Sequence, residues 1–478
     1  MKRRTKIVAT LGPATDDLKT LKKMIKHGLD VARVNFSHGD SDAHRARAEL
    51  LRKAAAKAGR QVALMGDLQG PKIRIRRFED GSVMLEDGAD FFLDSTLGKE
   101  AGTIDGVAVA LETLHEDVAA GDVLLLNDGM IVLEVDRVEG TRIHTKVVNG
   151  GRLSDNKGIN KKGGGLSAPA LTDVDKENIK LAAELDMDFL AVSFVRSGED
   201  VEEARRLFRE AGGDGHIVAK VERTEAVEDI DPIIEASDVI MVARGDLGVE
   251  MGYTELTGIQ KSLIRAARKA SKVVITATQM MESMIEHPIP TRAEVSDVSN
   301  AVMDGSDAVM LSGETAVGKH PIKAIKAMSE VCQGAEKFQL RPGATRYRLG
   351  ESFTYVDEAI AQAVMYTANH MNVSAIIALT ESGSTARWMS RIRSDIPIFA
   401  LTPHGKTRRR VAMYRGVYSV EFSIERTVDS QKLYRDIFDA MLERKLVKVD
   451  DLVVFTKGDM HGVTGGTNAM KILKVTES

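Results

Sequence analysis

Residues 216–248 read HIVAKVERTEAVEDIDPIIEASDVIMVARGDLG, two short apolar runs separated by a more polar segment. The first run ends in Lys220 and Glu222, and the second leads into Asp246. Side chains two residues apart on a strand share a face, so Lys220 and Glu222 are expected to point together. If the two strands are neighbours, two carboxylates and an ammonium converge on one spot. A surface salt bridge is the simpler interpretation, but the apolar flanks and the second acid at Asp246 argue against it.

Two carboxylates and an ammonium in one place favour metal binding and phosphoryl transfer. Carboxylate oxygens suit a hard divalent cation, Mg²⁺ or Mn²⁺. A lysine beside such a cation suits phosphoryl transfer, in which the protein mainly positions groups and offsets negative charge.

Similar apolar runs recur along the chain, most of them separated by amphipathic segments such as DDLKTLKKMIKHG (16–28) and DVEEARRLFREAG (200–212). Strands of this kind that alternate with helices indicate a parallel sheet covered on both faces. Eight units predict an α/β fold of the (β/α)₈ barrel type, with reactive groups at the carboxyl ends of its strands. An open doubly wound sheet is the alternative. The eight runs are TKIVATLG (5–12), VARVNFS (31–37), ALMGDLQG (63–70), FLAVSF (189–194), HIVAKVE (216–222), VIMVARGDLG (239–248), KVVITATQ (272–279) and AVMLSG (308–313).

The spacing of the runs predicts three domains. Residues 1–70 and 167–345 form the barrel, and residues 71–166 carry alternating runs and turn signals typical of an inserted small β domain. The insertion returns through NKGINKKGGGLSAP (156–169), a glycine-rich segment suited to the hinge of a lid. Residues 346–478 read as an open α/β domain.

Composition narrows the function classes. Among 478 residues the formal net charge is −4 and aromatic residues are 4%, which argues against a nucleic-acid-binding surface. The single cysteine, Cys332, excludes an intramolecular disulfide and favours a reducing compartment. No apolar run is long enough to cross a bilayer or to form a signal peptide. We therefore expect a soluble, cytoplasmic protein.

A series of long motifs resembles the pyruvate kinase family and spans nearly the whole chain. The resemblance implies a (β/α)₈ barrel, an inserted β-barrel lid and a C-terminal regulatory α/β domain. It also implies transfer of a phosphoryl group from phosphoenolpyruvate to ADP, which gives ATP and pyruvate, and a homotetramer. The motifs are KIVATLGPAT (6–15), RVNFSHG (33–39), DLQGPKIR (67–74), NKGIN (156–160), VAKVER (218–223), MVARGDLGVE (241–250), ATQMMESM (277–284) and PTRAEVSDVSNAVMDGSDAVMLSGET (290–315).

Carried over to this sequence, the resemblance assigns Glu222 and Asp246 to the divalent cation. Lys220 would stabilise charge on the phosphoryl group and on the enolate oxygen. The backbone N–H groups of Gly245 and Asp246, at the start of a helix, would bind the substrate carboxylate. Arg33 would bind phosphate with its planar fork of donors. The nucleotide would contact six residues: Asn35, Phe36, Ser37, His38, Arg74 and Lys157.

Thr278 is assigned to the protonation of the enolate. A threonine is a poor free acid, so we expect it to order a water or relay a proton, with Ser312 and Glu314 extending the relay. The alternative is a hydroxyl at a strand end that only satisfies the backbone.

Many relatives bind potassium with residues that correspond to Asn35, Ser37, Asp67 and the Leu68 carbonyl. Those relatives carry glutamate after Gly-Pro, where this chain has Lys72 in GPKIR (70–74). A fixed ammonium supplies the same unit charge as potassium and repels a second cation. We therefore expect activity that needs little or no potassium, although the oxygen ligands remain.

The segment LTESGSTARW (379–388) places hydroxyls and backbone N–H groups at an expected helix start, which favours phosphate. The resemblance makes this loop the site of an allosteric effector phosphate, held by Thr380, Ser382, Gly383, Ser384 and Thr385. The last loop, TKGDMHGVTGGTNAM (456–470), lacks the tryptophan and arginine that some relatives use for a second phosphate. A sugar monophosphate or AMP is therefore expected in preference to fructose bisphosphate, and an ordinary capped helix is the alternative.

Two rival functions remain at this stage. A metal-dependent barrel lyase or aldolase acting on pyruvate-like enolates would also place carboxylates at strand ends. It would not need an inserted lid or the phosphate-binding Arg33, Arg74 and Lys157. A non-catalytic sugar-phosphate sensor would not need Lys220 or Glu222.

Overall fold

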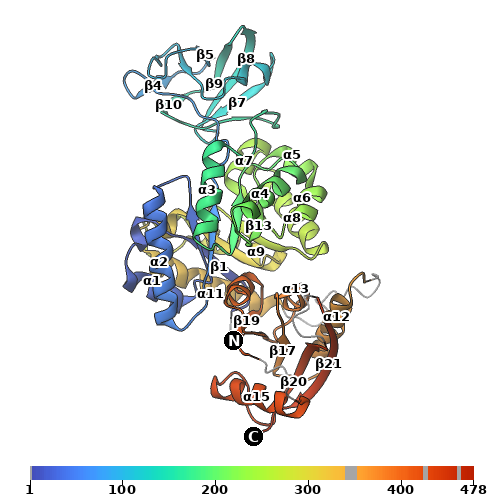
Figure 1. The fold of residues 1–478 in the computed structure, drawn as a ribbon. Coiled ribbons are helices and arrows are strands. Elements are labelled where there is room, and N and C mark those ends of the chain that lie inside the picture. The colour runs from blue at the N-terminus through green and yellow to red at the C-terminus, as the bar shows by residue number, and fades with distance from the viewer. Residues whose placement is uncertain (1–2, 340–352, 424–428, 460–464, 478) are drawn as a thin grey trace. The chain divides into compact units, whose positions relative to one another are not determined.

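Eight strands close into a barrel in the order β1-β16-β15-β14-β13-β12-β3-β2 in the computed structural model, which describes residues 3–339, 353–423, 429–459 and 465–477 (Figure 1). Strand β1 pairs in parallel with β16 and β2, β13 with β14, and β15 with β16. The eight predicted strands and the barrel class are confirmed. The strands are β1 (Lys6–Thr10), β2 (Val31–Asn35), β3 (Ala63–Asp67), β12 (Phe189–Val192), β13 (His216–Val221), β14 (Val239–Ala243), β15 (Val273–Ala277) and β16 (Ala308–Leu311).

The apolar runs are longer than the strands they contain. The run at 239–248 is strand only to Ala243, and helix α7 (Arg244–Met251) begins at the next residue. Nearly every strand residue is buried, as expected for strands covered on both faces. Some polar residues of these runs, such as Asp246, thus lie beyond the strand, whereas others, such as Lys220 and Asp67, lie at its carboxyl end.

The chain divides into two compact units. One comprises Met1–Gly66, Leu185–Phe189 and Ala267–Ser478, and the other comprises Asp67–Glu184 and Leu190–Ala266. The dividing lines run through the barrel, so these units differ from the three predicted domains. The predicted boundaries near 70 and 166 stay a prediction, and the one at 345–346 lies outside the described residues.

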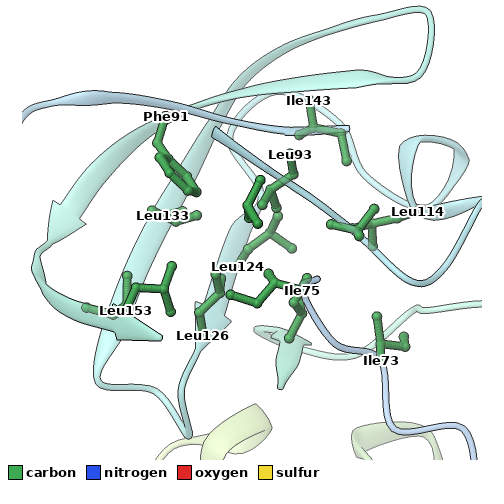
Figure 2. Packing of buried hydrophobic residues seen from close by; sticks show 14 of the residues in the cluster. Ile73, Ile75, Phe91, Leu93, Leu114, Leu124, Leu126, Leu133, Ile143 and Leu153 are labelled. Carbon is green, nitrogen blue, oxygen red and sulfur yellow. The ribbon is translucent and has the colours of Figure 1, made fainter. Parts of the chain in front are cut away.

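The second unit contains the predicted β insertion. A six-stranded sheet has the order β11-β7-β8-β9-β5-β6, and β4 (Ser82–Leu85) pairs antiparallel with β10 (Gly151–Ser154). Figure 2 shows Phe91, Leu93, Leu124 and Leu133 packed into one apolar core. The sheet strands are β5 (Asp90–Asp94), β6 (Gly106–Ala108), β7 (Val123–Leu126), β8 (Ile131–Glu139), β9 (Arg142–Asn149) and β11 (Ile159–Lys161).

The two connections of the insertion pair with each other. The Ile75 N–H donates to the Lys157 carbonyl, and the Ile159 N–H donates to the Ile73 carbonyl, both at 2.9 Å. The segment that leaves the barrel and the segment that returns to it therefore form one short ribbon. Helices of this unit are α3 (Asp173–Glu184), α4 (Gly198–Glu210), α5 (Thr224–Glu228), α6 (Ile230–Ala236), α7 and most of α8 (Leu256–Lys269).

The first unit contains the remaining barrel helices. Asp17 caps α1 (Leu18–His27) by accepting the Thr20 N–H, and Gly28 ends it with a φ of +125°. Burial raises the pKa of the Cys332 thiol to about 12, so this cysteine is core filling, as expected. The other helices are α2 (Ser41–Ala58), α9 (Arg292–Asp304), α10 (Gly313–Ala316) and α11 (Pro321–Gln339).

The C-terminal part of the first unit is an open sheet in the order β19-β18-β17-β20-β21, as the α/β prediction requires. Its core joins alternate residues of β17 to the apolar side of α15. In the described part of the chain, no helix is both long enough and apolar enough to span a membrane. The elements are α12 (Val356–His370), β17 (Ala375–Leu379), α13 (Ser384–Ser390), β18 (Ile398–Thr402), α14 (Gly405–Arg410), β19 (Val417–Glu421), α15 (Ser430–Glu443), β20 (Leu452–Gly458) and β21 (Thr467–Lys474).

Candidate active site

The second unit brings Lys220 and Glu222 together at the end of β13. The Lys220 Nζ lies 2.9 Å from Glu222 Oε1, and the two residues are 8% and 2% exposed. The expectation that they share a face is therefore confirmed. Their burial excludes the simpler interpretation of a solvated surface salt bridge.

Lys220 has two further partners. Its Nζ lies 3.2 Å from Asp67 Oδ1 and donates to Ser193 Oγ at 2.6 Å. Ser193 Oγ in turn donates to the Leu68 carbonyl at 2.7 Å. Asp67 and Leu68, expected as potassium ligands, are thus engaged by protein groups in this structure.

The loop after β3 fits closely against Ser193. Gly70 has a φ of +67°, and a Cβ at this position would lie 2.9 Å from the Ser193 Cβ. Asp175 Oδ1 accepts the N–H groups of Gln69 and Gly70, at 3.0 and 3.2 Å. Glycine and a buried aspartate therefore fix the segment that carries Asp67 and Leu68.

Glu222 lies among other carboxylates. Burial raises its pKa, Lys220 lowers it, and the nearby charges of Asp246 and Asp67 raise it, so that the net direction is upward. Its other oxygen, Oε2, accepts the Phe194 N–H at 2.9 Å. Clustered carboxylates of this kind fit a divalent cation, which would relieve their mutual repulsion.

Asp246 lies in the first turn of α7, directly after β14. Strands β13 and β14 are neighbours, as expected, with Lys220 opposite Met241. Asp246 has a partner that the sequence did not indicate, since Lys72 Nζ lies 3.3 Å from Asp246 Oδ1. Gly245 lies at the amino end of the helix, where backbone N–H groups have no partner within the helix.

Among the described residues, no group of three or more histidine, cysteine, aspartate or glutamate side chains is arranged to hold a metal ion. The predicted site needs only two protein carboxylates, those of Glu222 and Asp246. Phosphate and carboxylate oxygens of a substrate would have to supply further ligands.

The first unit places Arg33 in β2, where its Nη1 donates to Thr10 Oγ1 at 2.9 Å. The strand then ends in a tight turn, in which the Asn35 side chain accepts the Ser37 N–H and its carbonyl accepts the His38 N–H. Phe36 is buried, and its ring meets His44 edge-on at 5.1 Å. The Phe36 side chain thus serves packing, and its predicted contact with a nucleotide stays a prediction.

Thr278 has an unusual backbone conformation. Its φ is +68° and that of Gln279 is +52°. A positive φ is uncommon outside glycine, is rarest for a β-branched residue such as threonine, and clusters at functional sites. Its Oγ1 donates to the Ala277 carbonyl at 2.6 Å, the contact expected from a hydroxyl that satisfies the backbone.

Glu314 joins the loop after Thr278 to the end of β16. Its Oε1 accepts the Met281 N–H at 3.1 Å, and its Oε2 accepts the Ser312 N–H at 2.7 Å. Burial raises the pKa of Glu314. Ser312 therefore contacts Glu314 through its backbone.

Arg74 and Lys157 lie on the paired ribbon of the insertion. Arg74 forms an antiparallel bridge with Gly158, and its Nη1 donates to the Asn156 carbonyl at 2.9 Å. The two predicted nucleotide contacts are thus close together within the second unit.

The predicted effector loop lies between β17 and α13. Ser384 Oγ donates to Asp357 Oδ2 at 2.6 Å, and the same oxygen accepts the Trp388 Nε1–H at 3.2 Å. Of the final loop, residues 460–464 lie outside the described part of the chain. Three hydroxyls bond nearby: Thr380 to the Gly383 N–H at 2.9 Å, Ser382 to the Ser384 N–H at 3.4 Å, and Thr385 to Thr467 Oγ1 at 2.6 Å.

Comparison with known proteins decides the family. The barrel-domain model of pyruvate kinase matches residues 2–325, and the pyruvate kinase alpha/beta-domain model matches residues 358–473. The chain belongs to the pyruvate kinase family. It is 53% identical to pyruvate kinase II of Salmonella typhimurium over 477 residues, 99% of each chain. It is 51% identical to the pyruvate kinase of Haemophilus influenzae, also over 99% of each chain.

A more distant relative, the pyruvate kinase of Geobacillus stearothermophilus, is 42% identical over all of this chain and 81% of its own length. Pyruvate kinases are phosphotransferases, so these matches do not favour a lyase, an aldolase or a sensor.

Sequence reasoning did not single out Ser193, Asp175 or Glu250 in this member of the family. Ser193 stands at the polar end of FLAVSF, the same signal that identified Lys220, and was available. Asp175 and Glu250 lie within helices, and only the folded chain shows which loops they contact.

Proposed function

We propose that the chain transfers the phosphoryl group of phosphoenolpyruvate to ADP. A β-phosphate oxygen of ADP bonds to phosphorus, the bond from phosphorus to the enol oxygen breaks, and the resulting enolate takes a proton at carbon to give pyruvate. The observation that supports this most is the buried cluster of Lys220, Glu222 and Asp67 in a chain of this family.

Lys220 is proposed as the main stabiliser of charge on the phosphoryl group and the enolate oxygen. A buried ammonium offsets charge more strongly than an exposed one, because little water screens it. Contacts with Asp67, Ser193 and Glu222 hold its Nζ in place, so little reorganisation is needed during the reaction.

Glu222 and Asp246 are proposed to hold Mg²⁺ or Mn²⁺. When bound, the cation neutralises charge on substrate oxygens. Lys72, which pairs with Asp246 in this structure, is expected to release that carboxylate when the cation is present.

The other roles rest on the matching motifs. Arg33 would bind the transferred phosphate, and the N–H groups at the start of α7, at Gly245 and Asp246, would bind the substrate carboxylate. Thr278 would guide the proton to the enolate. The turn from Asn35 to His38, with Arg74 and Lys157, would bind the nucleotide.

A coupled assay that follows pyruvate tests the activity. Pyruvate should form from phosphoenolpyruvate only when both ADP and Mg²⁺ are present, with ATP appearing in equal amount. Pyruvate release without ADP would contradict phosphoryl transfer and support a lyase.

We expect this reaction to proceed without potassium. With tetramethylammonium as the sole monovalent cation, the rate should stay within about twofold of the rate in potassium, because the Lys72 ammonium already supplies the unit charge. Lys72→Glu should cost about tenfold or more in tetramethylammonium, since a unit charge at short range is worth a few kcal/mol. Potassium should restore that variant. A wild-type rate that collapses without potassium would refute the role of Lys72.

A phosphorylated effector, a sugar monophosphate or AMP, is proposed to bind the loop at 380–385. Trp388 is the single tryptophan and shares Asp357 with Ser384, so a phosphate that takes the Ser384 hydroxyl should change its fluorescence. A titration with a hexose monophosphate and with AMP measures this, and Ser384→Ala should weaken the response. If neither the fluorescence nor the kinetics changes with either phosphate, the loop at 380–385 is not an effector site. Assembly as a homotetramer and a cytoplasmic location are further parts of the proposal that follow from the family.

A further inference from the structure

Glu250 lies one helical turn after Asp246 in α7 and is 3% exposed. Its Oε1 accepts the side-chain amide of Asn160 at 3.3 Å, and its Oε2 accepts the Thr224 N–H at 3.1 Å. Its own carbonyl accepts the Gly163 N–H at 3.2 Å. One buried residue of α7 thus uses three oxygens to bind two other segments, the one that contains Asn160 and Gly163 and the one that begins at Thr224.

These segments carry the parts of the proposed site within the second unit. Asn160 and Gly163 belong to the returning connection of the insertion, which pairs with the segment that bears Lys72 and Arg74. Thr224 begins α5, two residues after Glu222. Glu250 itself shares α7 with Asp246.

The carboxylate of Glu225 also binds the returning connection of the insertion. Glu225 Oε1 accepts the Gly165 N–H at 2.5 Å, and a Cβ at Gly164 would lie 2.8 Å from Glu225 Oε2. The glycine run is therefore held at Gly163 by α7 and at Gly165 by α5. A side chain at Gly164, where φ is +78°, would strain the backbone and displace the Glu225 carboxylate.

Burial disfavours the charged form of the Glu250 side chain. Burial and the charge of Glu225 raise its pKa to about 7, against its hydrogen bonds and Arg223. A raised carboxyl pKa favours the folded state at low pH, and that contribution is lost as the pH rises towards about 7. A neutral side chain would be easier to bury at this position. The carboxylate is therefore explained by the groups that its two oxygens bind, the Asn160 amide and the Thr224 N–H.

We propose that Glu250 is a positioning residue that couples the hinge of the insertion to the two segments bearing Glu222 and Asp246. The inference rests on the roles proposed for those two acids. When the returning connection is bonded to Glu250, α7 and the start of α5 are held in one arrangement. When the connection leaves, Asn160 and Gly163 release their acceptors and the helix loses its tether.

Glu250→Leu keeps a similar volume and removes both carboxylate acceptors. It should lower kcat/KM for ADP by about 10- to 100-fold, the range found when a group that supports a metal site without binding the metal is removed. Glu250→Gln should retain activity within about threefold, since its oxygen accepts the Thr224 N–H and its amide donates to Asn160 after the Asn160 amide rotates.

A second measurement needs no catalysis and so separates this inference from the proposed function. Lys161 and Lys162 lie in the returning connection, so trypsin should cut there at least about tenfold faster in Glu250→Leu than in wild type or Glu250→Gln, as expected if local opening limits cleavage. Asn160→Leu removes the hydrogen bond from the Asn160 amide to Glu250 and leaves the one from the Thr224 N–H. It should accelerate the same cleavage. Wild-type cleavage and wild-type kinetics in Glu250→Leu would overturn the proposal. So would equal losses in the leucine and glutamine variants, because the charge and not the hydrogen bonds would then matter.

Discussion

Replacing Lys220 with methionine should lower kcat by about a hundred- to a thousandfold, the range found when one group that stabilises a transition state is removed. Methionine keeps most of the volume and removes the ammonium that faces Glu222 and Asp67. Steady-state kinetics measure the loss, and binding of Mn²⁺ by electron paramagnetic resonance should remain largely intact. A variant that turns over normally would show that the role given to Lys220 is wrong.

The same substitution has a consequence for stability. It leaves two buried carboxylates without their ammonium, which typically costs about 3–5 kcal/mol. Mn²⁺ should recover part of that loss, because a bound cation restores the missing positive charge. Lys72→Met is the matched control, since it removes the ammonium beside Asp246, a less buried pair. It should be much less destabilising. Equal destabilisation in both variants would mean that burial of the Lys220 cluster does not increase the cost of removing its ammonium.

Glu222→Gln should weaken Mn²⁺ binding by more than about tenfold and reduce activity by at least about a hundredfold, since it removes a charged ligand and not merely a supporting contact. The structure adds a pH signature. Because the pKa of Glu222 is raised, protons compete with the cation, and Mn²⁺ affinity of the wild type should rise with pH above the usual range of a glutamate. Isothermal titration with Mn²⁺ at several pH values measures both effects, and the variant should lose this slope.

The raised pKa of Glu222 also determines how the stability of the folded protein changes with pH. Without cation, the contribution of protonated Glu222 is present at low pH and is lost as the pH rises through its folded value. Glu222→Gln should remove that loss, so its metal-free thermal stability should fall less with rising pH. Glu250→Gln is the control, because it changes a buried carboxylate that does not bind the cation, and its Mn²⁺ affinity should match wild type. A Glu222→Gln protein that binds Mn²⁺ normally would exclude Glu222 as a ligand.

The eight strands and the barrel class followed from the sequence because both faces of each strand are buried. Such strands are mostly apolar, and the polar residues near their carboxyl ends, such as Asp67 and Lys220, mark the end of the barrel where the candidate site lies. The pairing of Lys220 with Glu222 was also predictable, since alternation along one strand is a local property.

Local pattern alone did not identify the partners that Asp246 and Lys220 have in this structure. Asp246 pairs with Lys72, 174 residues away in sequence, and Lys220 turns to Asp67 and Ser193. Which strand ends meet depends on barrel closure and on the register between strands, and neither is encoded in a single run.

The sequence by itself thus determined the family, the barrel and the residue types of the site, because each depends on spacing within a run or on long motifs. Only the tertiary structure decided which side chains contact one another. Glu250 reaches Asn160 across 90 residues, and its acceptors are filled by groups that approach only once the insertion has folded back on α7. A contact between distant segments has no periodicity to reveal it, since it depends on how the whole chain closes.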